Sequence, residues 1–296
     1  MVIIVVYEPR GAYTRRIASA IAANDIPVEI LTWRNFNFDI VNQLDPSATT
    51  IFFRTSAPSA VRVARRFEDA GFHVLNGSLY MQLSGHKYLA NVHAQANGIG
   101  IPSLNVTLDK ANHELLALYL KQFGPLVAKP IFSKDQGRFV YLLRNEGDFK
   151  RVAAIPGTSI LVQSEVKFDR LVRAIVTTEG MLVEATTWDT KHESWKATVC
   201  DNPNAQKYRD VPVELIDVVE GTLRAFGGHI AYIDFFETDQ GYLLSEINHS
   251  CGLMQHERIS GCPIASELGS FVARQETSES GTSNADASPV QPLQHP

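Results

Sequence analysis

Length, composition and charge exclude several classes of protein. The chain has 296 residues, with 27 Lys and Arg against 32 Asp and Glu, which gives a net charge of −5 at pH 7. This balance argues against a general nucleic-acid binder, which needs a basic surface to neutralise phosphates. No apolar run approaches the roughly 20 residues of a membrane span, and three cysteines are too few for a disulfide framework or a structural zinc site. We therefore expect a soluble, cytoplasmic protein.

Strands and helices alternate in the first 80 residues. Short apolar, β-branched runs of this kind are typical of strands buried on both faces of a sheet. The expected order is strand Val2–Tyr7, helix Gly11–Ala23, strands Val28–Leu31 and Ala48–Phe53, helix Pro58–Ala70 and strand Phe72–Leu75. This alternation predicts a small parallel α/β layer.

The pattern changes after residue 85. A helix is expected at Lys87–Asn97, followed by short strands at Leu126–Lys129, Phe139–Leu143, Ile160–Val166, Leu171–Thr177 and Met181–Thr187. A helix at Pro212–Phe226, a hairpin of Ile230–Glu237 with Gly241–Asn248, and a helix at Ile264–Ala273 complete the pattern. The segment Gln275–Pro296 is rich in Ser, Thr, Pro, Asn and Gln and is predicted to be disordered. The fold class is α/β, with α+β character after the first layer.

The hairpin carries a candidate metal site. Side chains alternate along a strand, so Glu246 and Asn248 point to one face, and Asp234 on the preceding strand can lie beside them. Two carboxylates and an amide oxygen suit Mg²⁺, a hard cation that prefers oxygen ligands. The alternative is that these are polar residues on the solvated side of the hairpin.

Two lysines are candidates for phosphate binding. Lys129 ends an apolar strand, where burial is costly without an anionic partner, and a polar loop that contains Ser133 follows it. Lys87 opens the helix expected at Lys87–Asn97. Taken alone, each lysine is more often a surface residue with a buried aliphatic stem. The chain has neither the P-loop pattern nor a complete dinucleotide fingerprint.

Six motifs occur in the order typical of one superfamily. They are Gly85-His-Lys87 with Gly98-Ile-Gly-Ile-Pro102, Val127-Ala-Lys129-Pro130, Ile160–Val166, Leu171-Val-Arg173, Asp234 with Glu246-Ile-Asn248, and Gly252–Ile264. In this order the chain resembles the ATP-grasp superfamily, in its glutamate-ligase (RimK-like) branch. That branch includes ribosomal-protein glutamate ligases, ligases that act on an amino-group carrier protein, and maturases of microviridin-type peptides. The resemblance extends from about Val74 to Ala273.

The resemblance implies a domain order and a set of site residues. It implies an N-terminal pre-ATP-grasp domain at 1–84, a central ATP-grasp lobe at 85–162, a C-terminal lobe with the metal site at 163–274, and a disordered tail at 275–296. Asp234, Glu246 and Asn248 would bind Mg²⁺ or Mn²⁺. Arg173 and Arg209 would be catalytic, although Lys196, Asn202, Asn204, Lys207 and Arg209 compete for roles in the segment before the long helix. The implied ATP-binding residues are Lys87, Lys129, Ser133, Gln163, Ser164, Glu165, Val166, Asp169 and Lys196.

The activity implied by the resemblance is an ATP-dependent carboxylate–amine ligase. A carboxylate would attack the γ-phosphate of ATP, and an amine (or a hydroxyl) would then displace phosphate from the acylphosphate. Its partners would be ATP and a small amino acid or an acidic peptide or protein acceptor, without nucleic acid or membrane, in a possible homodimer or homotetramer. One alternative is a kinase-like or regulatory ATP-binding protein with the same fold, and another is an interaction module with a vestigial nucleotide site.

Overall fold

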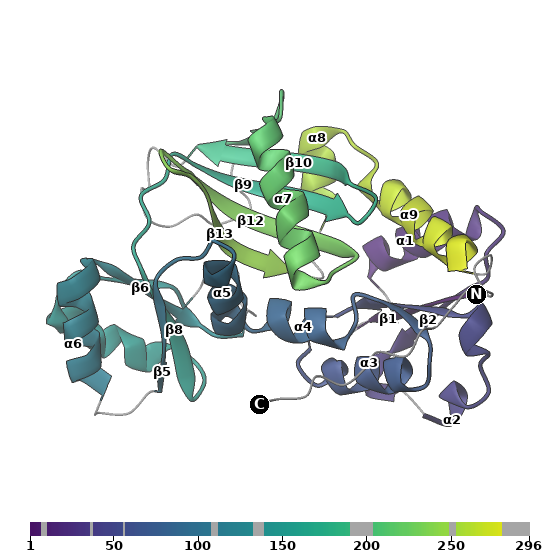
Figure 1. Ribbon diagram of the computed structural model, residues 1–296, viewed down its shortest axis with the longest axis horizontal. Helices are drawn as coiled ribbons and strands as arrows, with labels where there is room; N and C mark the ends of the chain where they lie inside the picture. The colour runs from purple at the N-terminus through teal and green to yellow at the C-terminus, as the bar shows by residue number, and fades with distance from the viewer. Residues whose placement is uncertain are drawn as a thin grey trace, which may run out of the picture.

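The described part of the chain is organised around three β-sheets. The computed structural model describes residues 1–6, 11–35, 38–55, 57–107, 112–132, 139–189, 204–248 and 253–279, drawn in colour in Figure 1. The sheets follow one another along the sequence, and helices cover their faces. This arrangement confirms the predicted α/β class.

The first sheet is parallel and has the strand order β2-β1-β3-β4. Its strands are β1 (Val2–Val6), β2 (Val28–Thr32), β3 (Thr50–Arg54) and β4 (His73–Leu75). Every residue of β1 is buried, as its continuous apolar run predicts. Helix α1 (Ala12–Ala22) packs on one face and α3 (Ala60–Asp69) on the other. The short helix α2 (Phe38–Val41) lies between β2 and β3 in the sequence.

The second sheet is antiparallel, with the order β5-β8-β6-β7. Its strands are β5 (Ser103–Thr107), β6 (Leu126–Pro130), β7 (Tyr141–Leu143) and β8 (Ser159–Ser164). Helix α6 (Asn112–Phe123) and the 3₁₀ segment η3 (Glu146–Ala154) contribute to the apolar core on one face. Alternate residues of β6 and β8 therefore point to the opposite face, which lacks that cover.

The third sheet has five antiparallel strands in the order β11-β10-β9-β12-β13. These are β9 (Arg170–Thr177), β10 (Met181–Asp189), β11 (Ala205–Lys207), β12 (Ile230–Thr238) and β13 (Gly241–Asn248). Helix α7 (Val213–Phe226) packs on one face, together with residues of α4 (Ser78–Gly85) and α5 (Lys87–Ala96). Helix α8 (Met254–Ser260) lies beside β10 and β11 (Figure 1).

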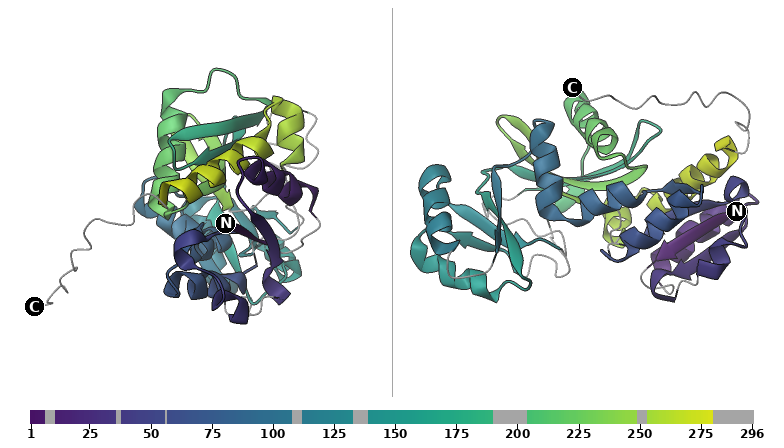
Figure 2. Two further views of the ribbon diagram at one scale, coloured as in Figure 1. Left: turned by 90° about the vertical axis from the view of Figure 1, so that its right-hand side faces the viewer. Right: turned by 60° about the horizontal axis from the view of Figure 1, so that its bottom comes forward.

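The C-terminal helix α9 (Ile264–Glu279) returns to the first sheet and packs against α1 (Figure 2). The two helices approach closely at Gly269, where an added Cβ would lie 2.4 Å from the Cβ of Ala20. One core joins the two ends of the described chain, since Ile4 and Ile17 belong to the same cluster as Leu268.

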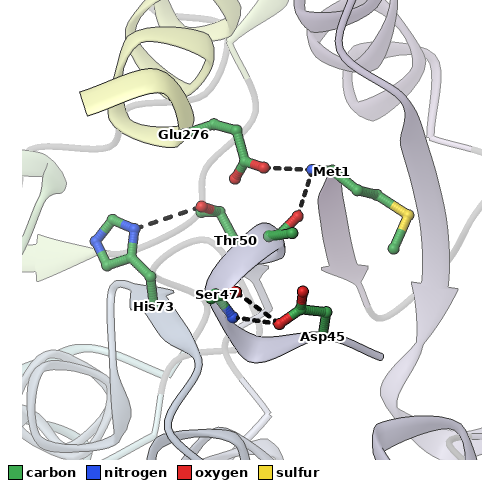
Figure 3. Close-up of polar contacts among 7 residues, drawn as sticks. Met1, Asp45, Ser47, Thr50, His73 and Glu276 are labelled. Carbon is green, nitrogen blue, oxygen red and sulfur yellow. Dashed lines mark hydrogen bonds and ion pairs between the residues drawn. The ribbon is translucent and has the colours of Figure 1, made fainter. Parts of the chain in front are cut away.

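The expected start of the disordered tail at Gln275 is wrong by five residues. Helix α9 continues to Glu279, and Figure 3 shows Glu276 directed toward the amino group of Met1, with which it forms an ion pair. The same amino group donates a hydrogen bond of 2.7 Å to the carbonyl oxygen of Ala48. The helix therefore gains a polar contact beyond its last buried apolar residue, which composition does not reveal. Residues 280–296 lie outside the described part of the chain.

Several described elements were not expected from the sequence, namely α2, α4, β5, α6, η3, β11 and α8. Most of them are short or have mixed polar and apolar composition. Within the described ranges, none of the helices has the length and apolar character needed to cross a membrane.

Candidate active site on the third sheet

A row of polar side chains crosses the third sheet. The register pairs Thr186 of β10 with Arg173 of β9, Arg173 with Asp234 of β12, and Asp234 with Glu246 of β13. Lys207 of β11 is paired with Thr186 and extends the row to the edge. Directly paired residues point to the same face, so the sheet itself brings these side chains together.

Apolar clusters flank this row on the same face of the sheet. On one side, Ile175 and Tyr232 belong to the core shared with the first sheet. On the other side, Leu171 and Trp188 form a smaller cluster with Phe168. The polar row is therefore a narrow band in an apolar surface, where charges need partners within the protein.

Arg173 and Asp234 form a buried, bidentate ion pair. The Nε atom of Arg173 donates to Oδ1 of Asp234 and Nη2 donates to Oδ2, each at 2.5 Å. The exposed fractions of the two side chains are 9% and 4%. Burial raises the pKa of the Asp234 carboxyl, and the Arg173 guanidinium opposes that rise. The pair thus holds two opposite charges in fixed geometry within a dry environment.

Two lysines from other elements reach the carboxylate end of the row. The Nζ atom of Lys87, the first residue of α5, donates to Oε1 of Glu246 at 2.8 Å. The Nζ atom of Lys129, on β6 of the second sheet, lies 3.5 Å from the carbonyl oxygen of Ser245. Desolvation and the neighbouring Lys87 lower the pKa of Lys129 to about 8. Two ammonium groups therefore lie near each other and near Glu246, a distribution that favours an anionic ligand.

A β-bulge on β13 adapts the strand to this site. The register moves from Asp234 opposite Glu246 to Phe235 opposite Leu244, so Ser245 is the extra residue. The bulge lets Leu244 face the α7 core while Glu246 stays on the face of Asp234. The carbonyl oxygen of Ser245 is directed to Lys129.

A buried histidine of α8 covers the other end of the row. His256 is 3% exposed, and its Nδ1 atom lies 3.0 Å from Oγ1 of Thr186 while Nε2 lies 3.4 Å from Nη1 of Arg173. Desolvation and the charge of Arg173 lower the pKa of His256 to about 4. Sequence reasoning gave His256 no role, because a histidine in a seven-residue helix gives no spacing signal of its own.

Three residues of the expected ATP-binding set, Gln163, Ser164 and Glu165, lie where the second sheet passes into the third. Gln163 is 3% exposed, and its Nε2 atom is buried without a hydrogen-bond partner among the described residues. The backbone N–H of Ser164 donates to Pro102 at 3.0 Å, and that of Glu165 donates to Pro125 at 2.8 Å. These bonds fix the end of β8 and the start of the connection to β9.

The remaining predicted site residues lie apart from the row or outside the described chain. Val166 packs against the Phe168 cluster, and Asp169 is exposed beyond it. Arg209 is exposed two residues after β11. Ser133 and Lys196 lie outside the described residues.

The donor atoms at Asp234, Glu246 and Asn248 fit a hard divalent cation. The two carboxylates are paired across the ladder, and Asn248 lies two residues along the strand on the same face. A carboxylate has about four lone-pair positions, so the two bonds from Arg173 leave acceptor capacity at Asp234 for a metal. The part of the chain that the structure describes contains no group of three or more His, Cys, Asp and Glu suited to a metal.

The sequence matches the model of a known family. Residues 84–272 match the RimK-like ATP-grasp domain, so the chain belongs to this family. No curated protein matches the sequence.

Solved structures of ATP-grasp enzymes share the fold. The ATP-grasp ligase PsnB, complexed with minimal precursor, Mg and ADP, is 16% identical with a TM-score of 0.69, covering 93% of this chain and 97% of that chain. The D-cycloserine synthetase DcsG is 14% identical with a TM-score of 0.67, covering 93% and 100%. The D-alanine–D-alanine ligase from Bacillus anthracis, complexed with ATP, is 14% identical with a TM-score of 0.65, covering 94% and 97%. At these identities the likeness shows a shared fold.

Proposed function

We propose that the protein is an ATP-dependent carboxylate–amine ligase that works through an acylphosphate. The observation that carries this proposal is the convergence of Lys87 and Lys129 on Glu246, next to the buried pair of Arg173 and Asp234. Cations for phosphate, carboxylates for a metal and a fixed guanidinium are the groups that phosphoryl transfer to a carboxylate requires. Family membership supports the same activity.

ATP would bind between the second and third sheets. The unpartnered Nε2 atom of Gln163 offers a buried donor, which supports a heterocycle at the end of β8. Lys129 and Gln163 point to the same face of the second sheet, because Val127 pairs with Gln163 and Lys129 follows Val127 by two residues. The phosphates would extend from Gln163 toward Lys129 and Lys87.

The carboxylate end of the row would hold the metal through Asp234, Glu246 and Asn248. A bound Mg²⁺ would neutralise charge on the phosphate oxygens during transfer. Lys87 pairs with Glu246, and its ammonium group lies where it would also bind phosphate oxygens. Lys129 would bind phosphate as a half-buried cation whose charge is lost above a pH of about 8 in the free protein.

Arg173 would stabilise the reacting acyl group. Its bidentate pairing with Asp234 fixes the plane of the guanidinium, so donors are oriented before substrate arrives. No covalent nucleophile is needed in this reaction, because the acylphosphate is formed directly on the substrate carboxylate. The amine would then attack that carbonyl carbon and phosphate would leave.

The acceptor would lie toward β10, β11 and α8, at the end of the row away from Lys87 and Lys129. Lys207 at that end, and Arg209 two residues further along the chain, favour an acidic peptide or an amino acid that carries a carboxylate. Peptide precursors bind to the neighbour PsnB, which supports a peptide acceptor here. We further propose a cytoplasmic enzyme, a dimer or a tetramer, with lobes divided near residues 84 and 162.

The test is ADP release with Mg·ATP and a panel of amino acids, short acidic peptides and carrier-type peptides. Acceptor-dependent ADP release, with a product whose mass equals the sum of the substrates less water, is the expected result. Glu246→Gln should abolish turnover. The matched control is Glu237→Gln. Glu237 lies on the same hairpin and forms an ion pair with Arg170 of β9, and its substitution should retain turnover.

Two other outcomes would contradict the ligase proposal. ADP release with a phosphorylated acceptor and no condensed product would indicate the kinase-like alternative. If Mg·ATP neither turns over nor raises the melting temperature, the nucleotide site is vestigial and an interaction module is the better description.

A further inference from the structure

Helix α8 supplies a side chain that contacts the row from outside the sheet. His256 lies over Arg173 and Thr186, and both of these residues are buried, at 8% and 0% exposed. Its two ring nitrogens are directed to different partners, Nδ1 to the Thr186 hydroxyl and Nε2 to the Arg173 guanidinium. The imidazole thus links α8, β10 and β9.

The chemistry of these partners determines the state of the ring. A guanidinium can only donate hydrogen bonds, so Nε2 of His256 must accept from Nη1 of Arg173 and carries no proton. The neutral ring then carries its proton on Nδ1 and donates it to the hydroxyl oxygen of Thr186. Burial beside a fixed cation keeps the imidazole neutral at physiological pH.

This contact constrains the guanidinium at a third point. Nε and Nη2 of Arg173 are held by Asp234, and Nη1 is held by His256. Two bonds to one carboxylate fix the plane of the group but allow it to shift with the carboxylate. The third bond comes from a different element and ties that position to α8.

We infer that His256 is a positioning residue, which as the neutral Nδ1–H tautomer, oriented by Thr186, holds the guanidinium of Arg173 in place. Its importance for turnover rests on the proposed ligase function, whereas its tautomer and its contact with Arg173 do not. When a group that stabilises a transition state is displaced by about 1 Å, the rate can fall about 100-fold. We therefore expect loss of this contact to leave ground-state binding of ATP unchanged.

The first experiment compares kcat and KM for ATP in substituted proteins. His256→Leu should lower kcat about tenfold to 100-fold, with the KM for ATP within about twofold, and His256→Gln should recover part of kcat because an amide oxygen can accept from Arg173. Thr186→Val should also lower kcat, because the proton on Nδ1 loses its acceptor. Its matched control is Thr222→Val, which removes a buried hydroxyl that donates to Val218 at 2.6 Å within α7.

The second experiment needs no turnover. Nitrogen NMR of protein labelled in histidine reports which ring nitrogen carries the proton, and His256→Leu identifies the signal. The Nδ1–H tautomer is expected at pH 7, with loss of its preference in Thr186→Val and no change in Thr222→Val.

The two experiments separate the inference from the proposed function. An Nε2–H tautomer, or an imidazolium at pH 7, overturns the inference. So does equal kcat in wild type and His256→Leu, or equal loss in the Leu and Gln variants. If the tautomer is as expected but no acceptor is ligated, the positioning contact stands and the proposed ligase function fails.

Discussion

The buried pair of Arg173 and Asp234 leads to a quantitative prediction about stability. Arg173→Met keeps an unbranched apolar stem but removes both bonds to the carboxylate, each of 2.5 Å. Because the two side chains are only 9% and 4% exposed, water cannot replace those bonds without opening the sheet surface. Removal of one partner of a buried pair costs about 3–5 kcal/mol, and we expect a loss of this size.

An exposed pair in the same molecule provides the matched control. Arg274 of α9 contacts Glu179 through Nε and Nη2 at 2.6 to 3.1 Å, which is again bidentate. Its side chains are 54% and 29% exposed. Exposed pairs contribute about 0–1 kcal/mol, so Arg274→Met should cost no more than about 1 kcal/mol. The two variants differ mainly in the burial of the pair they break.

The assay is urea unfolding at pH 7, followed by circular dichroism, for both single variants and for Arg173→Met with Asp234→Asn. The double variant should recover part of the loss, since no unpaired buried charge remains. If Arg173→Met destabilises the protein no more than Arg274→Met does, burial does not increase the contribution of the ion pair to stability, and the prediction is refuted.

Three further predictions concern stability. Asn76 has a φ of 59° and forms hydrogen bonds with the backbone of His229 and Ile230, so Asn76→Ala should lower the free energy of unfolding by about 2 kcal/mol or more. Asn76→Gly loses the same bonds without the backbone strain, so its loss in urea unfolding should be about 1 kcal/mol smaller. Equal losses in the two variants would contradict the role of φ. Burial lowers the pKa of His229 from 6.5 to about 4, so between these pH values the folded state binds fewer protons than the unfolded state, and stability should fall as the pH falls from about 6.5 to 4. His229→Gln should reduce this dependence of stability on pH. An unchanged dependence would contradict the prediction. Gly269→Ala should lower the melting temperature because its Cβ meets Ala20, and Ala20→Gly in the same chain should restore part of the loss, whereas no restoration would place the strain elsewhere.

Periodicity and alternation predicted the parts of the fold that local sequence determines. The apolar run from Val2 specified a fully buried strand, and β1 has that form. Alternation in the hairpin placed Glu246 and Asn248 on one face, and the register sets Asp234 opposite Glu246. Lys87, named from the sequence as a candidate for phosphate binding, contacts Glu246.

The remaining features depend on contacts between distant segments. Nothing in the segment around Ser245 indicates a bulge, because the extra residue is defined only against β12. Arg173 and Asp234 are 61 residues apart, and their pairing follows from β12 lying beside β9. His256 acquires its partners only when α8 packs on β10. Propensity and spacing cannot report such relationships.

The return of α9 to the first sheet affects the order in which the chain can fold during synthesis. The side chains of Val2 and Ile4 share their core with Leu268 and Phe271, so one face of the parallel layer lacks part of its cover until α9 has emerged. At about 5–20 residues per second, the ribosome needs roughly 15 to 55 seconds to make the intervening chain. For that interval the exposed strands are at risk of aggregation, and we expect chaperone dependence to be greatest for nascent chains that end before Ile264.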